Sequence, residues 1–117
     1  MQLSELTTLL NGTLLTQPTR EITDLNFCGA ADLMDEIRRQ FAKGSVLVTG
    51  LTSGGVIQTA IDYKLQVVVM VRGKKPSPKE LELAQAVGLP VLMTRHTLFT
   101  TCGLLYSNGI RGLDGTW

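Results

Sequence analysis

The stretch SVLVTGLTSGG, residues 45–55, decides the fold. Its apolar part, residues 46–48, has the β-branched composition of a short buried strand and breaks off at Gly50. Apolar residues with helical spacing resume at Val56, so the loop between them lies at the start of a helix. A strand, a turn and a helix in this order predict one repeat of an α/β fold with a parallel sheet.

The same order of elements recurs twice further along the chain. Residues 67–71, VVVMV, predict a second buried strand, and the basic turn RGKKP at 72–76 leads to a helix after Ser77. Residues 90–93 predict a third strand, followed by a turn at residues 94–97 and a last helix over residues 98–107. Because helical crossovers of about a dozen residues join parallel strands, we expect the three strands to be parallel neighbours.

The remaining segments predict two further helices and two further strands. They are a helix from Ser4 that ends at Asn11-Gly12, a strand at Leu14-Leu15, an irregular strand over residues 21–27, and an amphipathic helix over residues 30–42. The apolar face of the last helix is formed by Leu33, Met34, Ile37 and Phe41. The whole pattern predicts an α/β fold in three layers, with a mostly parallel sheet sandwiched between helices.

Composition favours a single domain over residues 1–112 with a short tail at 113–117. The chain has 117 residues, of which 44% are hydrophobic and 18% charged, as in an average globular protein. With 11 basic and 10 acidic side chains, the net charge of +1 gives no reason to expect nucleic acid or an anionic membrane surface as a partner.

The apolar runs and the cysteines bear on location. Apolar runs of about five to seven residues are far shorter than the roughly 20 needed to span a bilayer. The first residues, MQLSE, lack the basic start of a signal peptide, so we expect a cytoplasmic protein. Cys28 and Cys102 do not have Cys-x-x-Cys spacing, which predicts buried free thiols, no metal site and no cofactor.

The carboxyl ends of the predicted strands are where a ligand is expected, because open α/β sheets bind ligands at that edge. The candidate ligand-binding residues all lie in the turns that follow the strands, and they are Thr49, Thr52, Ser53, Gly54, Gly55, Arg72, Gly73, Thr94, His96 and Thr97. Glycines let the backbone approach a ligand closely, and amides at a helix start favour a phosphate or carboxylate.

Each candidate also has a purely structural interpretation. Thr52 or Ser53 could cap the following helix, and His96 could cap the last one. The basic residues Arg72, Lys74 and Lys75 could simply be solvated. These alternatives stay open on the sequence.

The sequence predicts no catalytic residues and therefore no enzyme. The single histidine, His96, has no acidic partner in its turn, and the acids fall on predicted helical faces. The acids in question are Asp32, Asp35, Glu36, Glu80 and Glu82. No Gly-x-x-x-x-Gly-Lys-Ser/Thr run is present, so the phosphate cradle of a kinase of that type is missing.

Several short motifs resemble the DRTGG-domain family, in its stand-alone short version. They are Arg72-Gly73, Pro76-x-Pro78-x-Glu80-Leu81, the run GLPVLMT at 88–94, Phe99, Tyr106 and Gly109-Ile110-Arg111-Gly112. The chain is also similar to the N-terminal domain of HPr kinase/phosphorylase. The resemblance implies an α/β domain without assigned catalytic activity, in a regulatory or accessory role, with a signalling or hydrogenase-related protein as a possible partner.

The chain departs from the motif that gives this family its name. Where members carry Gly-Asp-Arg after the central strand, this chain has Leu51-Thr52-Ser53. Where they carry Thr-Gly-Gly after the next strand, it has Val71-Arg72-Gly73, which keeps only the last glycine. The charged pair of the motif is therefore missing at these positions.

The sequence as a whole predicts a regulatory domain that senses an anionic small molecule or nucleotide. The alternative is an interaction module that binds a protein partner and no small ligand. A homodimer is expected because the glycine-punctuated end of the chain carries Ile110, Leu113 and Trp117, which need a surface to cover.

Overall fold

A central sheet, in the order β1-β5-β4-β3-β2, organises the computed structural model, which describes residues 1–40 and 44–114. Its five strands within the described residues are β1 (Thr13–Leu14), β2 (Cys28–Ala30), β3 (Val46–Thr49), β4 (Val67–Met70) and β5 (Val91–Met93). The strands from β2 to β5 are parallel, and β1 runs antiparallel to β5 at one edge. The expected parallel arrangement of the three long apolar runs is confirmed.

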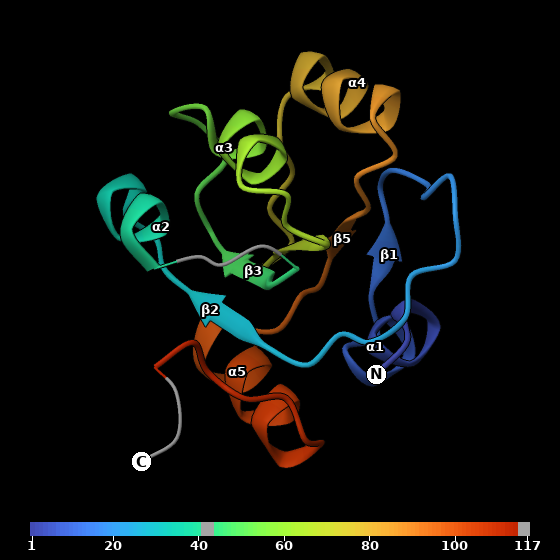
Figure 1. Ribbon diagram of the computed structural model, residues 1–117, viewed down its shortest axis with the longest axis vertical. Coiled ribbons are helices and arrows are strands. Elements are labelled where there is room, and N and C mark those ends of the chain that lie inside the picture. Colours follow the sequence, from blue (N-terminus) through green and yellow to red (C-terminus); the bar gives the residue numbers. More distant parts are fainter. Residues whose placement is uncertain (41–43, 115–117) are drawn as a thin grey trace.

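Helices cover both faces of the sheet and complete the three layers predicted (Figure 1). They are α1 (Leu3–Leu9), α2 (Met34–Gln40), α3 (Val56–Asp62), α4 (Pro78–Ala86) and α5 (Leu98–Ser107). In Figure 1, α2, α3 and α4 lie above the sheet, and α1 and α5 lie below it. No helix in the described part of the chain is long and apolar enough to cross a membrane.

The central strands β3 and β4 are buried on both faces, which explains their unbroken apolar sequence. In β4, Val67 and Val69 join the core shared with α1 and α5, and Val68 and Met70 join the core shared with α3 and α4. Successive side chains alternate between the two faces of a strand, so a single apolar run supplies both cores.

The starts of α4 and α5 follow the capping signals of the sequence. Ser77 Oγ accepts a hydrogen bond from the Glu80 amide at 3.3 Å, and Pro78 occupies the first helical turn, where its missing N–H costs nothing. Thr97 Oγ1 accepts from the Thr100 amide at 3.3 Å and caps α5. The capping role considered for His96 therefore belongs to Thr97.

The strand predicted over residues 21–27 is wrong. Residues 21–26 are irregular, and the strand that pairs with β3 is Cys28–Ala30. Ile22 and Leu25 are buried, but their backbone groups pair with the N-terminal segment and not with a strand. The Ile22 carbonyl accepts from the Leu3 amide, and the Leu25 amide donates to the Met1 carbonyl. A left-handed Asp24, with φ of 59°, interrupts the extended backbone between them.

The helix predicted over residues 30–42 is shorter at its start. It begins at Met34, because residues 28–30 are used by β2 and the chain turns before the helix. Leu33 lies in this turn and is 68% exposed, so it does not belong to the apolar face; Ile37 does and is fully buried. Phe41 lies outside the described residues.

The expectation that Ile110 needs a partner's surface is also wrong. Its side chain is 4% exposed and packs into the core on the α5 side of the sheet. The segment folds back beside β2, where Phe27 and Arg111 form a parallel bridge. Leu113 is half-buried, and Trp117 lies outside the described residues.

Candidate functional site

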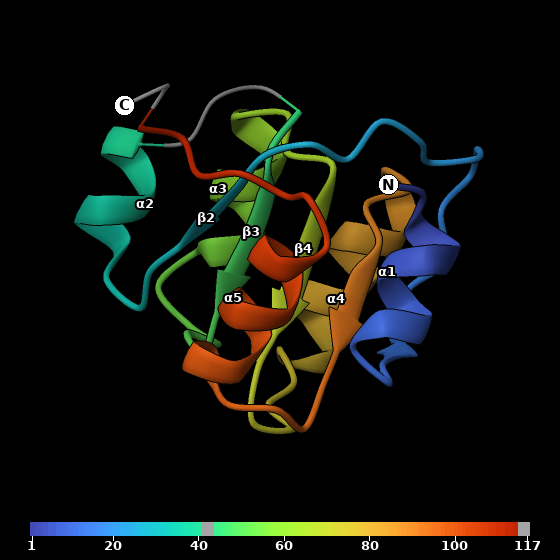
Figure 2. The same ribbon diagram turned by 90° about the horizontal axis from the view of Figure 1, so that it is seen from below.

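The turns that follow β3, β4 and β5 meet at the carboxyl edge of the sheet, and those after β4 and β5 lie together at the lower edge of Figure 2. Backbone hydrogen bonds tie them to one another. The Arg72 amide donates to the His96 carbonyl at 2.8 Å, and the Gly73 amide donates to the Thr94 carbonyl at 2.8 Å. The candidate residues of these two turns are therefore neighbours in space.

The turn after β2 joins the same edge through Asp32. Its Oδ1 accepts a 2.7 Å hydrogen bond from the Gly50 amide and lies 3.4 Å from Thr49 Oγ1. A Cβ added at Gly50 would lie 3.1 Å from Arg72 Nη2 and 3.4 Å from Asp32 Oδ1. A carboxylate and a guanidinium therefore lie close together, beside the Cα of Gly50.

Asp32 is a residue of this edge that the sequence analysis missed. It was assigned to the face of a helix, but α2 begins only at Met34, and Asp32 lies in the turn between β2 and α2. Asp32 and Arg72 together bring one charge of each sign to this edge. The signal available in the sequence was an aspartate directly after a short strand.

Arg72 adopts a backbone conformation that non-glycine residues avoid. Its φ is 55°, and the φ of Gly73 is 69°, both in the left-handed region. For an L-residue this conformation costs roughly 1–2 kcal/mol. The two hydrogen bonds to the turn after β5 hold it in place.

The side chain of Arg72 is exposed. Among the described residues, the ion pair found is Arg38 with Asp35, and Arg72 takes part in none. Its guanidinium therefore presents its fork of N–H donors to the solvent, beside the Asp32 carboxylate.

Thr49 and Thr94 act as structural supports of this edge. Both are buried, at 0% and 1% exposure. Thr94 Oγ1 donates to the Leu10 carbonyl at 2.8 Å and accepts from the His96 amide at 3.3 Å, while Thr49 Oγ1 accepts from the Leu51 amide at 3.0 Å. Their hydroxyl groups position the turns and are not presented to the surface.

The glycine-rich loop before α3 is open to solvent at Ser53, Gly54 and Gly55, and Thr52 is half-buried. The residue at the N-cap is Gly55, with φ of 79° and no side-chain hydrogen bond, so the capping role considered for Thr52 and Ser53 is wrong. A Cβ at Gly54 would lie 3.3 Å from Met34 Cγ, which places the tip of the loop against α2.

Arg72 and Asp32 are both exposed at the carboxyl edge, so they would contact a ligand from the surface. A cavity of about 350 Å³ lies at the opposite edge of the sheet.

Within the described residues, the cysteines and acids do not form a reactive or metal-binding cluster. No group of three or more histidine, cysteine, aspartate or glutamate side chains is placed to hold a metal within residues 1–40 and 44–114. Both cysteines are free and half-buried, and burial, with the nearby Cys102 thiol, raises the pKa of Cys28 to about 12. A thiol with so high a pKa stays protonated and is a poor nucleophile at neutral pH.

Comparison with solved structures finds the same fold in a regulatory protein. The crystal structure of the CBS and DRTGG domains of the regulatory region of Clostridium perfringens pyrophosphatase, complexed with the activator diadenosine tetraphosphate, superposes with a TM-score of 0.73 at 18% identity. The match covers 88% of this chain and 45% of that chain, so this chain spans less than half the length of that structure. At this identity the likeness shows a shared fold.

Comparison with curated proteins finds no match. A model of the DRTGG domain matches residues 5–107, which is most of the chain and includes every strand of the sheet. On this match, the protein belongs to the DRTGG domain family.

Proposed function

We propose that this protein is a non-catalytic regulatory domain that senses an anionic small molecule of the nucleotide class at the carboxyl edge of its sheet. The observation that carries the proposal is the exposed guanidinium of Arg72, which is held by a left-handed backbone between two turns. Conformations of this kind persist only where the surrounding structure enforces them, and they cluster at ligand-binding sites.

The charges at this edge favour a nucleotide over a bare phosphate. Arg72 offers several donors in a plane, which matches the oxygens of a phosphate. Asp32 offers an acceptor beside the guanidinium, near the same face of Gly50, and a carboxylate repels phosphate but accepts a hydrogen bond from a ribose hydroxyl. We assign the phosphate to Arg72 and the ribose to Asp32.

The remaining candidates have supporting roles in this proposal. Gly73 and the exposed Gly54 and Gly55 allow the ligand to approach the backbone, and Thr52 and Ser53 border that approach. His96 is half-buried beside Arg72 through the backbone hydrogen bond between them. Thr49, Thr94 and Thr97 hold the turns in place through the hydrogen bonds described above.

The solved neighbour supports the class of ligand. That protein's regulatory region contains a DRTGG domain with the same fold and was crystallised with a nucleotide activator. The free thiols of Cys28 and Cys102 fit a reducing compartment such as the cytoplasm, where such nucleotides are found.

The proposal is tested by calorimetric titration of the full chain with ATP and with diadenosine tetraphosphate. We expect binding that Arg72→Gly abolishes, because this variant removes the guanidinium and keeps the left-handed backbone. Arg39→Gln is the matched control, because Arg39 is an exposed cation in the last turn of α2, at the opposite end of that helix from the turn that carries Asp32. If Arg72→Gly binds these nucleotides as tightly as the control variant does, the proposed site is wrong.

A second candidate function, self-association, is favoured by one face of α5. Phe99 is 87% exposed and Tyr106 is 64% exposed, and they lie on the same side of the helix as the exposed Gly103. The sequence of α5, LFTTCGLLYS, carries no charge, and the Arg111 guanidinium stacks on the Tyr106 ring, 4.4 Å from its centroid, at the end of this face. We propose that this face forms a twofold homodimer. The alternative is that a different protein binds to the same face.

A further inference from the structure

A second recess lies at the amino edge of the sheet, opposite the proposed nucleotide site. Its volume is about 350 Å³, and its lining includes Gly44, Gln66 and Pro90, which come one or two residues before β3, β4 and β5. The segment between β1 and β2 runs across this end of the sheet, along the upper edge of Figure 2. We call this recess the amino-edge cavity.

One wall of the cavity depends on a close approach between two loops. A Cβ at Gly88 would lie only 2.5 Å from Thr19 Oγ1, and Gly88 has a left-handed φ of 72°. Only glycine satisfies both conditions at this position. The Thr19 loop therefore lies against the end of α4, where it borders the cavity.

The floor of the cavity is apolar. Ile22, Leu65 and Leu89 line it and are 4%, 6% and 6% exposed. Val87 stands at the rim with 53% of its surface exposed, which leaves an apolar side chain open to an incoming ligand. An apolar floor with a polar rim is the usual composition of a small-molecule site, and the volume is at the lower end of the roughly 300–1,000 Å³ of such sites.

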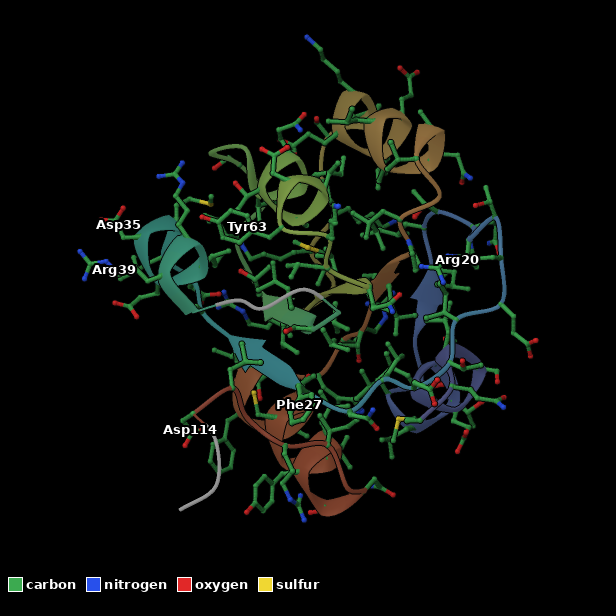
Figure 3. The ribbon with its side chains drawn as sticks, in the orientation of Figure 1. Arg20, Phe27, Asp35, Arg39, Tyr63 and Asp114 are labelled. Carbon is green, nitrogen blue, oxygen red and sulfur yellow. The ribbon has the colours of Figure 1, made fainter. Side chains whose placement is uncertain are left out.

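Among the described residues, the charged side chains that line the cavity are two cations, Arg20 and Lys64. Arg20 comes from the irregular segment that runs beside β1, as Figure 3 shows. Its Nη2 donates to Gln66 Oε1 at 3.3 Å, which holds the guanidinium at the cavity while its other donors stay free for a ligand. Neither Arg20 nor Lys64 belongs to an ion pair in residues 1–40 and 44–114.

The carboxyl ends of α3 and α4 also face this edge, and their carbonyl groups would repel an anion if they were free. One of these carbonyls at the end of each helix is paired with the backbone. The Leu65 amide donates to the Ala60 carbonyl at 2.9 Å, and the Leu89 amide donates to the Ala84 carbonyl at 2.9 Å. These two carbonyls are therefore not free to repel an anion.

We infer that the amino-edge cavity binds a small organic anion with an apolar body, whose phosphate or carboxylate is held by Arg20 and Lys64. The apolar body lies against Ile22, Leu65 and Leu89. This site is independent of the proposed nucleotide site, because β4 separates the two edges of the sheet by about 13 Å. The chain then carries a separate ligand site at each end of its sheet.

The test is a titration of the full ¹⁵N-labelled chain with phenyl phosphate and with benzoate, followed by amide chemical shifts. Inorganic phosphate and benzyl alcohol separate the contributions of the charge and of the apolar body. We expect saturable changes in the amide chemical shifts of residues 64–66 and 88–89 with phenyl phosphate and benzoate. Inorganic phosphate and benzyl alcohol should bind more weakly. The better of the two anions shows whether the site selects phosphate or carboxylate.

Variants test the role of the two cations. In Arg20→Gln/Lys64→Gln we expect the affinity to fall by roughly tenfold or more, because two charge-assisted contacts are lost. Lys79→Gln should bind like the unmodified chain. The inference is overturned if neither anion shifts these amides, if benzyl alcohol binds as tightly as the anions, or if the double variant and the control bind equally well.

Discussion

The Gly50 amide donates a 2.7 Å hydrogen bond to the Asp32 carboxylate, across 18 positions of sequence. This contact ties the turn after β2 to the turn after β3. It also sets the carboxylate beside Arg72, since both side chains lie within contact distance of a Cβ at Gly50. The electrostatic character of the carboxyl edge depends on this pairing.

Asp32→Ala should lower the free energy of unfolding by about 1 kcal/mol, because the Gly50 amide loses its acceptor at a partly exposed site. Asp32→Asn keeps a side-chain carbonyl oxygen and should lose less. Urea denaturation of the two variants measures the difference. Equal stability of Asp32→Ala and the unmodified chain would show that the contact does not form in solution.

Arg72→Gly should be more stable than Arg72→Ala by about 1 kcal/mol, because only glycine adopts the left-handed conformation without steric cost. This expectation rests on the φ angle of Arg72 in the unmodified chain, which is 55°. Thermal unfolding of the pair gives the comparison directly. If the alanine variant is as stable as the glycine variant, the backbone at this position is not left-handed.

The sequence was sufficient to predict the centre of the fold. Residues 46–48, 67–71 and 91–93 are recognisable because strands buried on both faces need continuous apolar runs. The start of α5 at Leu98 was predicted to the residue, since Thr97 caps it through a local hydrogen bond. Features with a local cause were readable in the sequence.

Features that depend on contacts between distant parts of the chain could not be read from the sequence. The strand β2 consists of Cys28, Gly29 and Ala30, none of them β-branched, and it forms because β3 and the segment at Arg111 offer partners. Asp32 looked like the other helical acids until its contact with Gly50 was known. The sequence pattern places Ile110 at a dimer contact, but the chain returns beside β2 and buries this side chain within the same subunit.

The Cys28 thiol gives a prediction of pH dependence. Its pKa rises from 9.0 to about 12 in the folded state, so the thiol ionises first in the unfolded chain. Its contribution to stability is therefore complete below pH 9 and is lost as the pH rises from 9 toward 12. Between pH 8 and 10 the unmodified chain should lose more stability than Cys28→Ala, as measured by urea denaturation. Parallel curves for the two chains would contradict the raised pKa.

Phe99→Ser should weaken self-association without loss of stability, because the side chain is 87% exposed in the monomer. Sedimentation equilibrium of both chains measures the effect, and we expect a dimer for the unmodified chain and a monomer for the variant. Thr100→Ala is the control, since Thr100 is exposed on the same helix but lies off the aromatic face. A monomer at all concentrations for the unmodified chain would rule out the homodimer.

The most direct test of the central claim is a map of amide chemical shifts during titration of the ¹⁵N-labelled chain with ATP. The account predicts saturable shifts at Gly50, at Arg72-Gly73 and at residues 94–97, and their loss in Arg72→Gly. Residues 64–66, at the opposite edge, report separately on the amino-edge cavity. If the amides of the carboxyl edge stay unshifted at millimolar ATP and millimolar diadenosine tetraphosphate, this edge is not the nucleotide site.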